Sequence, residues 1–251
     1  MPLTRIDVTD HVATITFAPP AEGYDRALLD AIGAAAAQVA AREDVRAVIL
    51  RSDGDFGVGW SASALDEPVG IPGVPHVAAG IDAVAAIPQP VIAAIRGRAH
   101  SVALELALAC DVRVTDEDAT FAMGDTSLGR VPLAGGTQRL PRAIGRAQAL
   151  RLVLLGEEID AAEALRLGLV SRAVRADELD AAAMAIADAI ASRGPIATRL
   201  AKEAVHRGVE MPLDQALRYE LDLTVLLQST ADRAEGVRAF AEKRPPRFIG
   251  R

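Results

Sequence analysis

Residues 90–114 read PVIAAIRGRAHSVALELALACDVRV, and this stretch decides the fold prediction. The apolar run at 91–95 has the length of a buried strand, and the segment RGR at 96–98 marks a turn. From Val102 onward the apolar residues resume and predict the start of a helix. The sequence therefore predicts a strand, a turn and a helix start around one carboxylate, Glu105.

Glu105 in this helix has two interpretations. The first backbone N–H groups of a helix have no partner within it, so the N–H groups near Val102 can stabilise an oxyanion, with Glu105 one turn later. Alternatively, Glu105 only complements the positive end of the helix dipole from a solvated position. These residues alone leave both interpretations open.

The rest of the chain predicts an α/β fold with a helical C-terminal part. Alternating patterns or apolar runs predict strands at 5–9, 12–17, 45–50 and 120–123, and helical patterns cover 28–39, 81–87 and most of the chain after residue 137. Residues 53–75 are rich in Gly, Pro and Asp, which is typical of an irregular connection that carries function. We expect a core at residues 1–193 and a helical region at 194–251.

Composition excludes several classes of function. The 251 residues include 34 acidic and 27 basic ones, and the net charge of −7 argues against general nucleic-acid binding. No run of apolar residues approaches the length of a membrane span, so we expect no membrane partner. Residues 1–17 lack a signal-peptide pattern, which favours a cytoplasmic location. Cys110 is alone and predicts a core residue.

Five segments, in chain order, carry a resemblance to the enoyl-CoA hydratase/isomerase, or crotonase, superfamily. Residues 56–59 (FGVG) resemble the family's Phe-Ser-Ala-Gly loop, and residues 99–111 resemble its glycine-rich loop and Glu-Leu-Ala helix. Residues 132–140 (PLAGGTQRL) are nearly its whole third motif, and 164–170 and 235–244 are similar to its later signatures. The resemblance implies a spiral of ββα turns with a C-terminal helical region used for trimerisation.

The resemblance also implies a reaction site for acyl thioesters of coenzyme A. Two backbone N–H groups, at Trp60 and Val102 by alignment, would hold the thioester carbonyl and stabilise an enolate. The matching positions for the two carboxylates of hydratases are Glu105 and Asp125, which permit acid and base roles. No metal and no separate cofactor are expected, because CoA is part of the substrate.

CoA contacts are implied at Val58, Ala62, Phe240 and Lys243, the last two often supplied by a neighbouring subunit. A basic patch at residues 243–247 suits an anionic ligand in this acidic chain, although an ordinary helix end with a C-terminal Lys is the alternative. The expected assembly is a homotrimer or a dimer of trimers.

The chain departs from the family pattern around the site. Residues 101–103 (SVA) replace a glycine triplet, so the loop must either use ordinary helical dihedrals or differ in shape. Asp125 stands where hydratases usually carry Glu, and a carboxylate misplaced by ~1 Å can lower a rate by ~10²-fold. Trp60 and Ser61 replace a small residue and an aspartate, so the indole ring either selects a substrate or occludes the site.

The leading prediction is hydration of a 2-enoyl-CoA to a 3-hydroxyacyl-CoA through an enolate stabilised by the oxyanion hole. The alternatives are double-bond isomerisation and a catalytically silent subunit that binds acyl-CoA. Residues 59–63 (GWSAS) nearly copy a serine-hydrolase nucleophile elbow but lack its final Gly, and His100 is expected to be structural.

Overall fold

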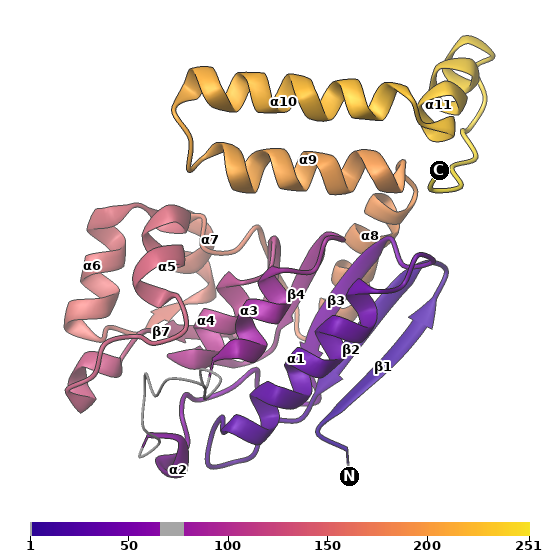
Figure 1. Ribbon diagram of the computed structural model, residues 1–251. Coiled ribbons are helices and arrows are strands. Elements are labelled where there is room, and N and C mark those ends of the chain that lie inside the picture. Colours follow the sequence, from indigo (N-terminus) through magenta and orange to yellow (C-terminus); the bar gives the residue numbers. More distant parts are fainter. Residues whose placement is uncertain (1, 66–77) are drawn as a thin grey trace.

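The structure, a computed structural model, describes residues 2–65 and 78–251 (Figure 1). Its main sheet has the strand order β1-β2-β3-β4-β6-β9. These strands are β1 (Thr4–Thr9), β2 (Val12–Phe17), β3 (Ala47–Ser52), β4 (Val91–Ile95), β6 (Val112–Asp116) and β9 (Arg172–Val174). β1 and β2 form an antiparallel hairpin, and the other neighbours pair in parallel. The predicted α/β class and hairpin are confirmed.

Helices cover both faces of the main sheet. The helices before residue 193 are α1 (Arg26–Ala40), α2 (Ala62–Leu65), α3 (Ala79–Ala85), α4 (Val102–Leu108), α5 (Gly136–Ile144), α6 (Arg146–Leu155), α7 (Ala161–Leu167) and α8 (Leu179–Ala191). Side chains alternate along a strand, so Val48 and Leu50 of β3 face the cluster that contains α1, α3 and α4. Ala47 and Ile49 face α8 instead.

A second, smaller sheet positions the start of α4. It consists of β5 (Arg98–His100), β7 (Thr120–Ala122) and β8 (Ile159–Asp160). β5 lies where the sequence predicted only a turn, because residues 98–100 pair in parallel with 120–122. The chain then passes from β5 through Ser101 into α4 at Val102, the residue at which the helix was expected to begin.

Other differences from the sequence prediction are short elements. α2 is a one-turn helix within the connection expected to be irregular at 53–75, of which residues 66–75 lie outside the described part. The 3₁₀ turn η1 (Asp125–Leu128) and the strands β8 and β9 also carry no periodic sequence pattern. Elements of two to four residues are too short to show a hydrophobic period, which explains why they were missed.

The C-terminal helices are α9 (Pro195–Gly208), α10 (Leu213–Gln228) and α11 (Ala231–Ala241). Figure 1 shows α9 and α10 side by side as a layer beyond the sheet, with α11 at its end. Lys202 of α9 docks this layer on the core, since its ammonium group donates to the carbonyls of Ile87 and Gln89 and contacts Asp111 at 2.7 Å. No helix in the described ranges is long and apolar enough to cross a membrane.

Tyr24 fixes the loop between β3 and α2. Its N–H donates to the Gly59 carbonyl, its carbonyl accepts from the Ser61 N–H, and its hydroxyl donates to the Phe56 carbonyl at 2.5 Å. The Tyr24 side chain is fully buried, so this carbonyl has no access to water. Gly57 lies directly against the ring, since a Cβ there would meet Tyr24 Cε2 at 2.2 Å.

We expect Tyr24→Phe to lower the free energy of unfolding by about 1–3 kcal/mol, because it leaves the buried Phe56 carbonyl without its donor. Urea denaturation measures this loss. Tyr219→Phe is the matched control, since its hydroxyl donates to Glu203 on the C-terminal helices, where water can replace it. Equal losses in the two variants would contradict this role for Tyr24.

Candidate active site

Glu105 lies in the first turn of α4 with no solvent exposure. Its Oε1 accepts two backbone hydrogen bonds, from the N–H groups of Ala134 and Gly136, both at 2.7 Å. Its Oε2 is buried and has no hydrogen-bond partner in the described residues. The solvated interpretation of Glu105 is therefore wrong, and these residues leave the hydrogen-bonding capacity of one carboxyl oxygen unsatisfied.

The loop of residues 132–136 is shaped to bring these two N–H groups to Glu105. Arg139 Nη1 donates to the Ala134 carbonyl at 2.7 Å and so fixes the orientation of the peptide next to Gly135. Gly135 has a φ of 107°, which favours glycine. At Gly136 a Cβ would lie 3.0 Å from Glu105 Oε1, so a glycine permits the close approach.

Asp125 is the second carboxylate of the site. It begins η1 and is 2% exposed, and its Oδ2 is buried without a hydrogen-bond partner in the described residues. Burial raises its pKa above the ordinary value, whereas the polar side chain of Ser101 and the charge of Arg130 oppose this rise.

Of the two carboxyl groups, Glu105 has the more strongly shifted pKa. Burial raises the pKa of Glu105 to about 7, and the nearby charge of Asp125 adds to the rise. The hydrogen bonds from Gly136 and Ala134 and the charge of Arg139 act in the opposite direction. The two carboxyl groups interact electrostatically, and a pKa near neutrality suits proton transfer in either direction.

The two predicted oxyanion donors lie on adjacent segments. Val102 is the first residue of α4, and its N–H precedes the first intrahelical donor, the N–H of Glu105 to the Ser101 carbonyl. Trp60 and Tyr24 form a parallel β-bridge, whose hydrogen bonds use the Gly59 carbonyl and the Ser61 N–H. The N–H of Trp60 therefore faces away from Tyr24. Within residues 2–65 and 78–251, no hydrogen bond occupies the N–H of Trp60 or of Val102.

The two segments contact each other through small residues. Gly57 bridges Ala99 of β5, and a Cβ at Gly59 would lie 3.6 Å from Ser101 Cβ. Val102 is helical, which is one of the two ways in which the loop at 101–103 was expected to form without its glycines. Ser101 instead takes the left-handed conformation, with a φ of 49°.

The Trp60 side chain is partly buried and packs against the main core cluster. Its indole Nε1 is buried and has no hydrogen-bond partner in the described part of the chain. The indole ring of Trp60 therefore packs against the core and does not extend into solvent.

Comparison with known proteins decides the family. Residues 7–251 match the enoyl-CoA hydratase/isomerase family model. The chain belongs to the enoyl-CoA hydratase/isomerase family. The crystal structure of an enoyl-CoA hydratase from Bacillus anthracis is 36% identical, covers 99% of this chain and 100% of that chain, and superposes with a TM-score of 0.90. This likeness confirms the crotonase-type fold with its helical C-terminal region.

Curated relatives of this hydratase/isomerase family member carry hydratase names. The (E)-benzylidenesuccinyl-CoA hydratase of Thauera aromatica is 35% identical over the full length of both chains. The probable enoyl-CoA hydratase echA8 of Mycobacterium tuberculosis is 47% identical over 167 residues, which cover 66% of this chain and 65% of that protein.

The four implied CoA contacts do not lie together in this family member. Val58 and Ala62 are exposed beside α2, whereas Phe240, 87% exposed, and Lys243 lie at the end of α11. Figure 1 shows α2 and α11 at opposite ends of the molecule. One chain therefore does not bring both pairs to one CoA molecule.

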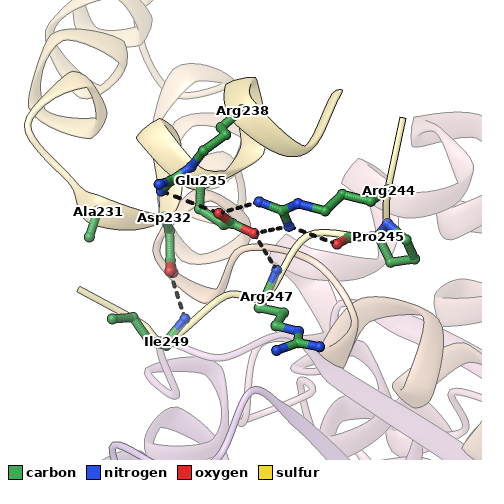
Figure 2. Close-up of a pocket in the computed structure, with 8 residues that line it drawn as sticks. All are labelled: Ala231, Asp232, Glu235, Arg238, Arg244, Pro245, Arg247 and Ile249. Carbon is green, nitrogen blue, oxygen red and sulfur yellow. Dashed lines mark hydrogen bonds and ion pairs between the residues drawn. The ribbon is translucent and has the colours of Figure 1, made fainter. Parts of the chain in front are cut away.

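The expected basic patch is partly neutralised within the chain. Figure 2 shows Arg244 turned toward Glu235, in a cavity of about 670 Å³ beside α11. Arg244 donates to both oxygens of Glu235 at 2.6 and 3.0 Å, and also to Glu242. Asp232 accepts from the N–H groups of Ile249 and Gly250, so the C-terminal segment is held against α11 and forms one wall of this cavity. Arg244 is therefore paired with carboxylates of its own chain, and anion binding by residues 243–247 stays a prediction.

Other candidate groups have structural roles. Ser61 is buried, and its Oγ accepts from the Ala64 N–H at the start of α2, which is the role of a helix cap and not of a nucleophile. His100 hydrogen-bonds Thr120 and contacts Glu158, and burial lowers its pKa. Cys110 is buried, and burial raises its pKa to about 12. His76 lies outside the described residues.

Sequence reasoning missed two groups that build the site. Tyr24 and Arg139 both donate side-chain hydrogen bonds to backbone carbonyls. The two adjacent glycines of PLAGG (132–136) are a signal that the backbone lies close to another group. They do not identify that group as the Glu105 carboxylate.

The raised pKa of Glu105 makes stability depend on pH. The ordinary value is 4.5 and the folded value about 7, so in this window the folded protein keeps a proton that the unfolded chain has lost. The Glu105 contribution to stability therefore falls as the pH rises through the window. We expect Glu105→Gln to gain on the order of 2 kcal/mol relative to the parent protein between about pH 4.5 and 7.5.

Urea denaturation across this pH range measures the gain. Glu117→Gln, at an exposed carboxylate, is the control and should show no such trend. A constant difference between Glu105→Gln and the parent protein would contradict the raised pKa.

Proposed function

We propose that this protein adds water to the double bond of a 2-enoyl-CoA thioester and forms a 3-hydroxyacyl-CoA, with Glu105 and Asp125 as the acid/base pair. The observation that carries the proposal is that each carboxyl group is buried and keeps one oxygen without a hydrogen-bond partner in the described residues. Family membership and the hydratase names of the relatives add support.

The proposed reaction uses the two backbone donors first. The N–H groups of Trp60 and Val102 donate to the thioester carbonyl and stabilise the negative charge that develops on it. One carboxylate removes a proton from water as its oxygen bonds to C3, and the electron pair of the double bond moves into the enolate. The other carboxyl group gives a proton to C2, so the net change is the addition of one water molecule.

We propose a homotrimer or a dimer of trimers as the working assembly, with the core at 1–193 and the C-terminal helices at 194–251. Exposed apolar residues on these helices support an interface there. Leu213, Leu217, Leu221 and Val225 recur at four-residue spacing along α10, and Val205 and Val209 lie at the end of α9 and just after it. Phe240 and Lys243 would then contact CoA bound at Val58 and Ala62 of a neighbouring subunit. A cytoplasmic location stays a prediction.

Double-bond isomerisation is the second candidate, because the matching family includes isomerases. In that reaction one carboxylate moves a proton between two carbons and the other is dispensable. A silent acyl-CoA-binding subunit is the third candidate, favoured by the partly buried Trp60 ring beside the donors. These three candidate functions predict different changes in activity when Glu105 or Asp125 is replaced.

The test is the loss of the conjugated enoyl-thioester absorbance with short, long and cyclic 2-enoyl-CoAs. We expect rapid loss with the parent protein, and Glu105→Gln and Asp125→Asn should each lower kcat by at least about 100-fold, because each removes a proton-transfer group. Glu117→Gln should leave the rate unchanged.

Two results would contradict hydration. A severe loss in one variant alone would favour isomerisation. No loss of absorbance with any thioester, while CoA thioesters still bind, would favour the silent subunit.

A further inference from the structure

The Arg139 side chain connects the loop that holds Glu105 to a neighbouring helix. Its guanidinium lies directly on Gly135, since a Cβ there would meet Arg139 Cζ at 3.0 Å. Nη1 donates to the Ala134 carbonyl at 2.7 Å, and Nη2 donates to Asp82 of α3 at 3.2 Å. Both α3 and α5 pack against α4, the helix that carries Glu105. One side chain of α5 therefore ties the loop of residues 132–136 to α3.

The main chain of this loop is held from both sides. The N–H groups of Ala134 and Gly136 donate to Glu105 Oε1. The Gly135 carbonyl, which shares a peptide group with the Gly136 N–H, accepts from backbone N–H groups in the first turn of α5. N–H and C=O point in opposite directions in a trans peptide, so this bond keeps the Gly136 N–H turned toward Glu105. The peptide between the two donor peptides is held by Arg139, through the Ala134 carbonyl.

No second side chain of the described ranges shares this role. Within residues 2–65 and 78–251, only Glu105 and Arg139 form side-chain hydrogen bonds to the main chain of residues 132–136. Two of these five loop residues are glycines, which gives the main chain many alternative conformations. Loss of the guanidinium should therefore release the loop, and with it the orientation of the Glu105 carboxyl group.

Arg139 also places a positive charge near Glu105. Burial and the charge of Asp125 raise the pKa of Glu105, and the charge of Arg139 lowers it. The charged groups that act on the Glu105 carboxyl are thus Asp125 of η1 and Arg139 of α5, and Asp82 of α3 pairs with the guanidinium. A variant without this charge changes the ionisation of Glu105 as well as its orientation.

We propose that Arg139 is a positioning residue for the hydration reaction: its guanidinium fixes the loop of residues 132–136, so that Glu105 is held by Oε1 and presents the unpartnered Oε2 to water or substrate. This inference rests on the proposed role of Glu105 in proton transfer. Arg139 acts through the main chain of the loop, and Asp82 holds the other side of its guanidinium.

Arg139→Met and Arg139→Lys are the first test. Met removes both the charge and the donors, whereas Lys keeps the charge and a donor group. We expect Arg139→Met to lower kcat for a 2-enoyl-CoA about tenfold or more with KM nearly unchanged, because Glu105 is no longer fixed in place. Arg139→Lys should lose several-fold less. Arg142→Met is the matched control on the same helix, since Arg142 is exposed and pairs with Glu210, and its rate should equal that of the parent protein.

A pH profile of kcat/KM gives a readout that a merely structural role would not move. Without the nearby positive charge the pKa of Glu105 rises further, so one limb of the profile should move to higher pH in Arg139→Met. The limb should stay near that of the parent protein in Arg139→Lys. Arg139→Gln keeps an amide donor without the charge and should show the same shift as Arg139→Met, which preserves the test if the Met variant does not fold.

Stability measures the same effect without turnover. The gain in stability from Glu105→Gln grows with pH until the pH reaches the folded pKa of Glu105, about 7 in the parent protein. In Arg139→Met the folded pKa is higher and the unfolded value is unchanged, so the gain should continue to grow at higher pH. Urea denaturation of Arg139→Met with and without Glu105→Gln measures this difference and shows that both proteins fold.

An unmoved pH limb in Arg139→Met, or a rise in KM with kcat unchanged, would overturn the proposal. Equal losses in Arg139→Met and Arg142→Met would overturn it too, because general damage to α5 would then explain them. Failure of the underlying function looks different: the parent protein would hydrate no enoyl-CoA, or Glu105→Gln would keep its full rate. The stability measurement tests the hold on Glu105 in that case as well.

Discussion

The site depends on the pair of hydrogen bonds that Glu105 Oε1 accepts from the N–H groups of Ala134 and Gly136. A fully buried carboxylate is unfavourable unless it is hydrogen-bonded, and backbone donors satisfy one oxygen without neutralising the group. The other oxygen remains without a protein partner. These hydrogen bonds join the loop of residues 132–136 to the start of α4.

Much of the fold follows from sequence periodicity. The strand at 91–95, the start of α4 at Val102 and the hairpin of β1 and β2 were predicted from apolar patterns, because these segments are long enough to show one. β5, β8, β9 and η1 were not predicted, because their formation depends on neighbouring segments far along the chain. β5, for example, exists through its pairing with residues 120–122.

For the site, sequence reasoning identified both carboxyl groups, and the structure brings Glu105 and Asp125 near enough to interact. What the sequence did not show is how each group is held. The donors to Glu105 are backbone atoms, which any residue type carries, and they lie 29 and 31 positions further along the chain. Such contacts depend on backbone direction and leave no residue pattern.

The most direct test of this account is a crystal structure of Glu105→Gln with a bound 2-enoyl-CoA. The account predicts that the thioester oxygen accepts hydrogen bonds from the N–H groups of Trp60 and Val102, and that the double bond lies between Gln at position 105 and the Oδ2 of Asp125. A thioester bound with its carbonyl away from both N–H groups, or with Asp125 remote from C2 and C3, would contradict it.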